Sequence, residues 1–420
     1  MNQKYDKQRY EKQEYDIIII GAGIAGLYSA YKIKQLSPSK TVLVLERDKK
    51  EWIGGRIGND WFYGQQIVTG AGVGRKKKDK YLIELLNELH IPTKECLIEM
   101  NYAKSVPTVI NIPKAIDFLK QKYESYKVKP TSTFSVFAKR ILGEKLYKDF
   151  TITAGYTDYE NEDIEEVLYH YGMNDNSPHW ISLIVPWKQL VTKLCDKIGW
   201  ENVKYKHTAL HILPLTNGFQ IETDKGNYFC KKVIVATNIT SILKLVPGAD
   251  SANSIYKNIG GQPFLRVYGK FDKKSDEIMK QFVPTQTIVA GPLHKLIPYD
   301  NGVYMIAYTD NEGALALKDH LTNNLQNREL FEDLLEVSLG IPKNTIHLTA
   351  IKGYYWPIGT HYYKPYSVQY KNRNQFINEI QHPLPNMLVV GEVVSKNQGW
   401  TEGALSSVHL VLHKKWIDGN

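Results

Sequence analysis

Cysteine is scarce in this sequence, and its placement argues against two common ways of stabilising a fold. The three cysteines, Cys96, Cys195 and Cys230, are widely spaced, form no Cys-x-x-Cys motif and have no paired histidine nearby. A disulfide framework or a zinc site needs grouped ligands, so we expect neither a disulfide nor a bound metal. Unpaired cysteines are typical of proteins from a reducing compartment.

Long hydrophobic runs are also lacking, with one exception near the N-terminus. Residues 17–30 are apolar, but Glu11, Glu14 and Asp16 precede them and three glycines interrupt them. That pattern is unlike a secretory signal peptide. No other run approaches the length that spans a bilayer. We therefore expect a cytoplasmic, or at least intracellular, protein without a transmembrane segment.

The overall composition is that of a soluble globular protein. Of the 420 residues, 43% are hydrophobic and 23% are charged, which is unlike a disordered or fibrous chain. This length suits one discontinuous domain or two interleaved domains.

Positive charge exceeds negative charge, with a formal net charge of +9. A clustered basic face would indicate a nucleic-acid or membrane partner. The one dense run, RKKKDK at 75–80, comes directly before a helical pattern of leucines. We interpret it as a solvated loop and helix start, and we expect no specific nucleic-acid partner. Weak, salt-sensitive binding to nucleic acid remains an alternative.

A strand, turn, helix and second strand follow one another near the N-terminus. Residues 15–20 (YDIIII) are a continuous apolar run typical of a strand buried on both faces of a parallel sheet. A glycine-rich turn, GAGIAG, follows, and residues 27–36 form a helical pattern that ends at Ser37-Pro38. Residues 41–45 (TVLVL) are the next strand, so the segment is a βαβ unit.

The glycine-rich turn predicts a dinucleotide site. Gly21 allows the tight turn, Gly23 lets the backbone approach a pyrophosphate, and Gly26 lets the helix pack closely on the strand. Glu46 stands 20 residues after Gly26, at the end of the second strand, where a carboxylate can bind a ribose hydroxyl. The alternative is a glycine turn that serves packing alone.

Two further motifs bear on which dinucleotide is bound. Gly54-Gly55-Arg56 offers free backbone amides and a fixed charge for a second approach to phosphate. Near the C-terminus, MLVVGE at 387–392 precedes GWTEGALSS at 399–407. A helix that starts there would point its N–H groups at an electron-rich ring and stabilise a reduced flavin anion. A surface turn and a packing helix are the alternatives.

The rest of the chain divides into helical and strand-rich parts. Residues 81–199 are mostly helical in pattern, with prolines that break the helices. Strand patterns return at 203–212, 219–223, 233–236, 264–271 and 303–309, a helical pattern covers 321–339, and a final helix is expected from about 401 to 416. We predict an α/β fold with a flexible tail at 1–14. Residues 15–80, 200–260 and 385–420 would form a discontinuous nucleotide-binding domain, and 81–199 and 261–384 a substrate-binding domain.

Taken together, IIIIGAGIAGL, Glu46, GGR, KKVIVAT and VVGE followed by GWTEGA resemble the flavin-containing amine oxidase family, which includes monoamine and polyamine oxidases. The resemblance implies a Rossmann-type FAD-binding domain with an inserted mixed substrate domain. It also implies that Ala209 contacts adenine through its backbone and that Gly391, Glu392, Trp400 and Thr401 border the flavin. The other residues expected to line the cofactor are Ile24, Ala25, Arg47, Gly72, Ala236 and Ala404.

The sequence departs from the family at two positions that matter for chemistry. Where the family has a lysine that holds a water near flavin N5, the matching stretch RVYGKF begins with Arg266. Arginine is a permanent cation, so it can position water or substrate but cannot act as a base. The stretch WPIGTHYYKPY from Trp356 aligns with the segment where monoamine oxidases attach flavin to cysteine, and it has no cysteine. FAD is therefore expected to be bound non-covalently.

The family also holds its substrate between two aromatic walls. Trp400 matches one wall, and Tyr366, or failing it Tyr363, is a candidate for the other. Such rings could guide a neutral amine by dispersion or a cation by cation–π attraction. Ordinary core packing is the alternative role for each of them.

The resemblance implies an FAD-dependent oxidoreductase acting on a small-molecule amine, with Arg266, Trp400 and Tyr366 at the reacting centre. Hydride would pass from the carbon next to nitrogen to flavin N5, and dioxygen would reoxidise the flavin and give hydrogen peroxide. A desaturase or protoporphyrinogen-oxidase-like enzyme is the alternative within the same fold, and Arg266 and the basic charge balance keep it open. A protein that binds FAD without turnover is the third possibility.

Overall fold

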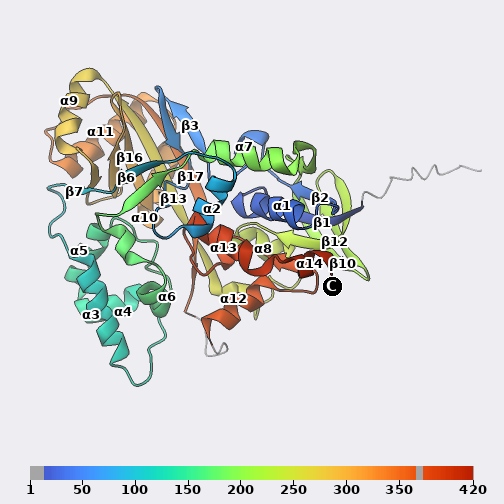
Figure 1. The fold of residues 1–420 in the computed structure, drawn as a ribbon. Helices are drawn as coiled ribbons and strands as arrows, with labels where there is room; N and C mark the ends of the chain where they lie inside the picture. Colours follow the sequence, from blue (N-terminus) through green and yellow to red (C-terminus); the bar gives the residue numbers. More distant parts are fainter. Residues whose placement is uncertain (1–13, 366–371, 420) are drawn as a thin grey trace, which may run out of the picture.

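The first of the two main sheets has a parallel centre and an antiparallel edge. The structure is a computed structural model that describes residues 14–365 and 372–419, and Figure 1 shows its two main sheets side by side. In spatial order, the strands of the first sheet are β10 (Ala209–Leu215), β11 (Gly218–Thr223), β12 (Gly226–Val235), β1 (Glu14–Ile20), β2 (Val42–Leu45) and β9 (Val203–Lys204), with β18 (Met387–Val389) also paired to β12.

The apolar run of β1 is explained by its central position. It pairs in parallel with β12 on one side and with β2 on the other. Ile17 and Ile19 point into one hydrophobic cluster and Ile18 and Ile20 into another, because alternate side chains face opposite sides of a strand. Both faces of the sheet are therefore buried, as the sequence predicted.

Helices cover both faces of this sheet. On the face of Ile17 and Ile19 lie α1 (Ile24–Leu36), α2 (Lys80–Glu88), α7 (Trp187–Ile198), α13 (Thr401–Val411) and α14 (Lys414–Asp418). On the other face lie α8 (Ile239–Leu245) and α12 (Arg373–Gln381). The predicted single final helix is wrong in one respect, because the chain leaves the helix at Leu412 and restarts at Lys414. Leu412 and Ile417 are both buried in the cluster around α1, so the break folds α14 back onto that cluster.

The second sheet is mixed and largely antiparallel. In spatial order its strands are β17 (Leu348–Tyr363), β13 (Ile259–Phe271), β16 (Val303–Asp310), β15 (Lys295–Pro298), β14 (Gln286–Ile288) and β7 (Met100–Tyr102). Within the described part of this second sheet, only the β14–β7 pair is parallel. The helices α9 (Lys273–Phe282), α10 (Asn311–Leu317) and α11 (Leu325–Leu339) pack on one face of it. The expected α/β fold, a Rossmann-type sheet with a second mixed sheet, is confirmed.

A group of helices with its own hydrophobic cluster lies at the lower left of Figure 1. It consists of α3 (Ile112–Glu124), α4 (Phe134–Leu142), α5 (Glu144–Ala154) and α6 (Ile164–Tyr169). The helical prediction for 81–199 missed three short strands, β6 (Lys94–Leu97), β7 and β8 (Ile181–Ile184). All four residues of β6 are exposed and β7 is only half-buried, so neither has an apolar pattern to signal a strand.

Two smaller sheets connect these parts. The strands β3 (Asn59–Phe62) and β4 (Gln65–Val68) form a hairpin, and β5 (Gly74–Arg75) pairs with β8, which also pairs with β6. The strands of the first sheet come from residues 14–45, 203–235 and 387–389, and those of the second from 100–102 and 259–363. The exact domain limits remain a prediction. Within residues 14–365 and 372–419, no helix combines the length and the apolar character that crossing a bilayer requires.

Candidate functional site

The glycine-rich turn between β1 and α1 is built by two glycines that tolerate no side chain. Gly21 has a φ of +105°, and a Cβ there would lie 2.5 Å from the Ala236 carbonyl oxygen. A Cβ at Gly26 would lie 1.9 Å from the carbonyl oxygen of Gly21. Both positions therefore serve the close packing of helix on strand. Ala236 lies behind the turn, where its amide donates to the Ile20 carbonyl.

Gly23 differs from these two glycines because its missing side chain faces open space. It is the N-cap of α1, its φ is −71°, and no atom lies within 4 Å of a Cβ placed on it. No side chain caps this end of α1, and its first turn, which begins with Ile24 and Ala25, has no acidic residue. The helix therefore presents unpaired N–H groups and a positive dipole end beside Gly23, which suits a phosphate.

The Gly54-Gly55 turn is held directly against this helix start. The Gly54 amide donates to the Ala22 carbonyl at 2.9 Å, and Gly54 pairs with Gly23. A Cβ at Gly55, which has a φ of +60°, would lie 3.4 Å from the Gly23 Cα. Two glycine turns from separate segments thus lie directly against each other, with Gly54 buried and Gly23 and Gly55 half-buried.

Glu46 supports the same turn from the end of β2. Its Oε2 accepts a hydrogen bond from the Ala22 amide at 2.8 Å, and its Oε1 accepts one from the Asp48 amide at 2.9 Å. Burial raises the pKa of the Glu46 carboxyl, while these amides act to lower it. Each carboxylate oxygen keeps a second lone pair that could accept from a ribose hydroxyl. The neighbouring Arg47 is exposed and lies 3.5 Å from Asp48.

The C-terminal motif reaches the glycine turns through β18. A Cβ at Gly391 would lie 4.0 Å from the Cβ of Ala25, and the Gly391 amide donates to Ser407 Oγ on α13. Ala404, one turn earlier on α13, is buried, and so is Thr401 at its start. The order of the sheet, with β18 beside β12 and β12 beside β1, therefore brings the last motif beside the first.

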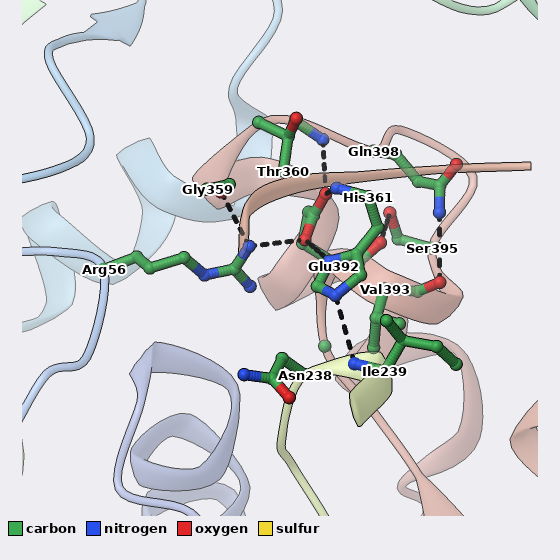
Figure 2. Close-up of polar contacts among 12 residues, drawn as sticks. Arg56, Asn238, Ile239, Gly359, Thr360, His361, Glu392, Val393, Ser395 and Gln398 are labelled. Carbon is green, nitrogen blue, oxygen red and sulfur yellow. Dashed lines mark hydrogen bonds and ion pairs between the residues drawn. The ribbon is translucent and has the colours of Figure 1, made fainter. Parts of the chain in front are cut away.

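Glu392 is the centre of a buried polar network, which Figure 2 shows. Its carboxylate accepts hydrogen bonds from Arg56 Nη1 at 2.9 Å, His361 Nδ1 at 2.7 Å, the His361 amide at 2.9 Å and the Gly399 amide at 2.8 Å. Burial acts to raise the pKa of Glu392, but His361, Arg56 and the Gly399 amide outweigh it and hold the pKa below its ordinary value. Glu392 is therefore an ionised anchor that joins the GGR turn, β17 and the start of α13.

His361 keeps a fixed neutral form in this network. Its Nε2 faces the Ile239 amide, which donates to it at 3.2 Å, so Nδ1 carries the proton that Glu392 accepts. Burial lowers the pKa of His361. Sequence reasoning missed this residue, because it stands in the aromatic stretch that drew attention only for its lack of cysteine, and a lone histidine there gives no signal.

Trp400 is fixed by a cation that the sequence assigned to a solvated loop. The Arg75 guanidinium lies 3.9 Å from the centre of the Trp400 ring and forms ion pairs with Asp79 at 2.7 Å and Asp175 at 2.9 Å. Arg75 and Asp79 are buried, so the prediction of a solvated run at 75–80 is wrong for these two residues. The helix start after the run is confirmed, since α2 begins at Lys80. Trp400 itself is half-buried and is the N-cap of α13.

Arg266 lies on the face of β13 that is turned away from α9, α10 and α11. It is 4% exposed, its Cζ lies 3.9 Å from the centre of the Tyr308 ring, and its Nη2 lies 3.4 Å from a Cβ placed on Gly72. Gly72 follows Ala71, whose amide donates to the Arg56 carbonyl at 2.8 Å. Arg266 therefore lies where the second sheet meets the loop that follows the GGR turn.

The remaining predicted residues lie in different surroundings. Tyr366 is outside the described residues. Tyr363 is fully buried, its ring packs edge-on against Phe376, and its hydroxyl donates to the Ser395 carbonyl, which is the core-packing role. Ala209 begins β10 and is half-buried against the cluster on the second face of the first sheet. No cluster of three or more His, Cys, Asp or Glu side chains suited to a metal ion occurs in the described residues.

Comparison with known proteins agrees with this arrangement. A family model described as an NAD(P)-binding Rossmann-like domain matches residues 19–89. A curated but uncharacterized protein of Acanthamoeba polyphaga mimivirus is 21% identical, and the match covers 96% of this chain and 94% of that protein.

Solved structures of two amine oxidases share the fold over almost the whole chain. A putrescine oxidase double mutant made to redesign cofactor binding superposes with a TM-score of 0.75 at 13% identity, covering 97% of this chain and all of that one (100%). Cyclohexylamine oxidase from Brevibacterium oxydans superposes with a TM-score of 0.74 at 16% identity, covering 96% of this chain and 98% of that one. The chain thus has the fold of these amine oxidases and contains a Rossmann-like dinucleotide-binding domain.

Proposed function

We propose that this protein binds FAD non-covalently and oxidises a small-molecule amine. The observation that carries the proposal is the meeting of three glycine-containing segments, around Gly23, Gly55 and Gly391, at the N-terminus of α1. The amine oxidase fold supports the same assignment.

FAD fits this site better than a nicotinamide dinucleotide does. A phosphate on α1 needs only the first glycine turn, whereas the Gly54-Gly55 turn and the start of α13 extend the site beyond it. No side chain caps the N-terminus of α13, so the amides of Thr401 and Glu402 would be available to an electron-rich ring. The Gly403 amide already donates to the Trp400 carbonyl, and the Glu402 carboxylate lies in the same turn. None of the three cysteines is suited to a covalent bond with the flavin. Cys96 is exposed, and Cys195 and Cys230 are buried in hydrophobic clusters.

The chain's own residues would hold the substrate and stabilise charge. Bound FAD would supply the two-electron oxidation of the carbon–nitrogen bond and pass the electrons to dioxygen. The positive end of α13 would stabilise negative charge next to it, and the Arg75-supported ring of Trp400 would form a rigid wall. Arg266 would orient substrate or water and, as a permanent cation, would not take up a proton.

The test is the visible spectrum of the FAD-loaded protein under anaerobic conditions while amines, polyamines and amino acids are added one at a time. We expect at least one amine to bleach the flavin band, and admission of air to restore it with one equivalent of hydrogen peroxide. Bleaching by a compound that is oxidised at a carbon–carbon bond would instead support a desaturase. A yellow protein that no compound bleaches would support FAD binding without turnover.

A further inference from the structure

Two buried cations share one aromatic cluster in the second sheet. Arg266 on β13 is 4% exposed and Lys295 on β15 is 2% exposed, and β16 lies between these strands. Both reach Tyr308 of β16, with Arg266 Cζ 3.9 Å and Lys295 Nζ 5.7 Å from the ring centre. Lys295 Nζ also lies 3.6 Å from the centre of the Tyr156 ring. The two positive groups are therefore close neighbours.

In the described part of the chain, neither cation forms a direct ion pair with a carboxylate, although the charges of Asp310 and Asp158 act on Lys295. Among the described residues, no carboxylate oxygen lies within 4.0 Å of a side-chain nitrogen of Arg266 or Lys295. Asp310, whose charge acts on Lys295, already accepts hydrogen bonds from the amide and hydroxyl of Thr157. Arg266 Nη1 lies 3.9 Å from Met305 Sδ, which is a weak contact. Burial raises the pKa of Tyr268, and a hydrogen bond with Arg266 acts to lower it. Tyrosine rings compensate part of the cost of burying a guanidinium, but a buried cation ordinarily needs an anion.

The cluster lies beside the candidate cofactor site. Arg266 lies beside Gly72, and the amide of Ala71, the residue before Gly72, donates to the carbonyl of Arg56 in the GGR turn. Because Glu392 is already paired with Arg56, its carboxylate offers no spare negative charge to Arg266. The carboxylate of a bound ligand would supply the negative charge that Arg266 lacks.

We propose that Arg266 and Lys295 bind a carboxylate of the substrate, so that the substrate is an amine that also carries a carboxylate, as an amino acid does. The inference rests on the proposed function in taking that ligand to be the oxidised amine. A guanidinium binds a carboxylate with two parallel N–H···O bonds, which fixes the orientation of the ligand. A net charge of +9 also suits an acidic substrate better than a polycation.

The proposal has a consequence for the pH dependence of binding. Burial lowers the pKa of Lys295 to about 7, Arg266 acts in the same direction, and Asp310 and Asp158 oppose it. Burial raises the pKa of Asp158 to about 7. Raising the pH through about 7 therefore removes a positive charge and adds a negative one, so carboxylate affinity should fall, while Arg266 stays charged throughout. The titratable side chains around Lys295 are Arg266, Tyr156, Tyr308, His294, Asp158 and Asp310.

The experiment measures binding to the oxidised, FAD-loaded protein, which requires no turnover. Acetate, butyrate and 3-phenylpropionate are titrated by calorimetry and by the flavin difference spectrum, with phenylethylamine as the amine that lacks a carboxylate. We expect at least one carboxylate to bind, and Arg266→Met to weaken it by about tenfold or more. Lys295→Met should weaken it several-fold at pH 6 and little at pH 8.5. Lys270→Met, a change on the same strand β13 at a lysine that donates to the Asn301 carbonyl, should leave it unchanged.

Three results of the binding experiment would overturn the inference without touching the proposed function. They are the absence of any carboxylate binding, equal binding by Arg266→Met and wild type, and loss of FAD rather than of carboxylate in Arg266→Met, which would place the guanidinium on the cofactor. Thermal unfolding of the ligand-free Arg266→Met variant distinguishes a ligand-binding role of Arg266 from a structural one. Removing an unpaired buried charge should leave the Tm unchanged or raise it, whereas a clear fall would assign Arg266 to the fold and contradict the proposal.

Discussion

Single residues in this site serve distinct purposes that a motif does not distinguish. Gly21 and Gly26 are required by backbone contacts, whereas Gly23 has open space where its side chain would be. Glu392 and Arg56 were predicted to face the cofactor independently, but the structure joins them in an ion pair of 2.9 Å. Arg56 and Glu392, which the sequence motifs assigned to the cofactor, therefore also bind each other and hold the site together.

The Glu392 network gives a prediction about stability. Glu392→Gln removes the charge that Arg56 and His361 bind, and disrupting a buried ion pair costs about 3–5 kcal/mol. Because the pKa of Glu392 is lowered in the folded protein, its contribution is present above the ordinary value of 4.5 and is lost as the pH falls through the folded value.

Denaturant unfolding of the ligand-free protein checks this at several pH values. Glu392→Gln should be strongly destabilised at pH 7, and its difference from wild type should shrink below pH 4.5. Glu277→Gln, an exposed change on α9, is the control. If Glu392→Gln lowers the free energy of unfolding at pH 7 no more than Glu277→Gln does, the stabilising role of Glu392 is contradicted.

At the scale of elements, the sequence predicts what periodicity and turns encode. The βαβ unit, the helix over 81–89 and the strands near 219–223, 233–236, 264–271 and 303–309 are confirmed with shifted ends. The strands β6 and β7 were missed because these short segments are exposed or half-buried and have no apolar alternation, and β8, whose central residues are buried, is only four residues long. All three form through pairing with distant strands.

The residues of the candidate site likewise fall into those that the sequence could predict and those that it could not. The residues near Gly23, Gly55 and Gly391 could be named because each follows a recognisable strand and turn. Lys295, Tyr156 and His361 could not be named, because they come from separate segments that only the folded sheets bring together. The placement of the predicted residues on a cofactor remains a prediction.

The contact between α13 and α2 gives a prediction for these elements. The Glu402 carboxylate, in the first turn of α13, accepts hydrogen bonds from the Tyr81 and Leu82 amides, each at 3.0 Å, and so caps α2 from another helix. Glu402→Ala should cost about 1–2 kcal/mol, as loss of an N-cap does. In Glu402→Ala, the amides in the first turn of α2 should exchange hydrogen faster than in wild type. The exposed change Glu84→Ala on the same helix should leave their exchange rates unchanged. Unchanged protection of α2 in Glu402→Ala would show that this cap is not needed.

At the scale of the whole molecule, the site lies where distant parts of the chain converge. The first sheet and the loops next to it supply the glycine turns, and the second sheet supplies Arg266 and His361. The helix α13, labelled in Figure 1, follows the Glu392 motif. A ligand that bridges these parts should stabilise all of them together.

FAD should therefore raise the unfolding temperature of the entire protein. At a free FAD concentration 100 times its Kd, the expected stabilisation is about 2.7 kcal/mol. Differential scanning fluorimetry of the apoprotein with FAD, and with NAD⁺ as the comparison, measures it. An equal rise with NAD⁺ would favour a nicotinamide site over a flavin site.

The most direct test of the account is the affinity for FAD of wild type and Gly23→Val. Gly23 has an ordinary φ and open space around it, so the ligand-free variant should fold with a stability within about 1 kcal/mol of wild type. Its side chain would occupy the place predicted for the pyrophosphate. We expect wild type to bind one FAD and the variant to bind it at least about tenfold more weakly. Equal affinity in the two proteins, or no binding by wild type, would contradict the assignment of this site to FAD.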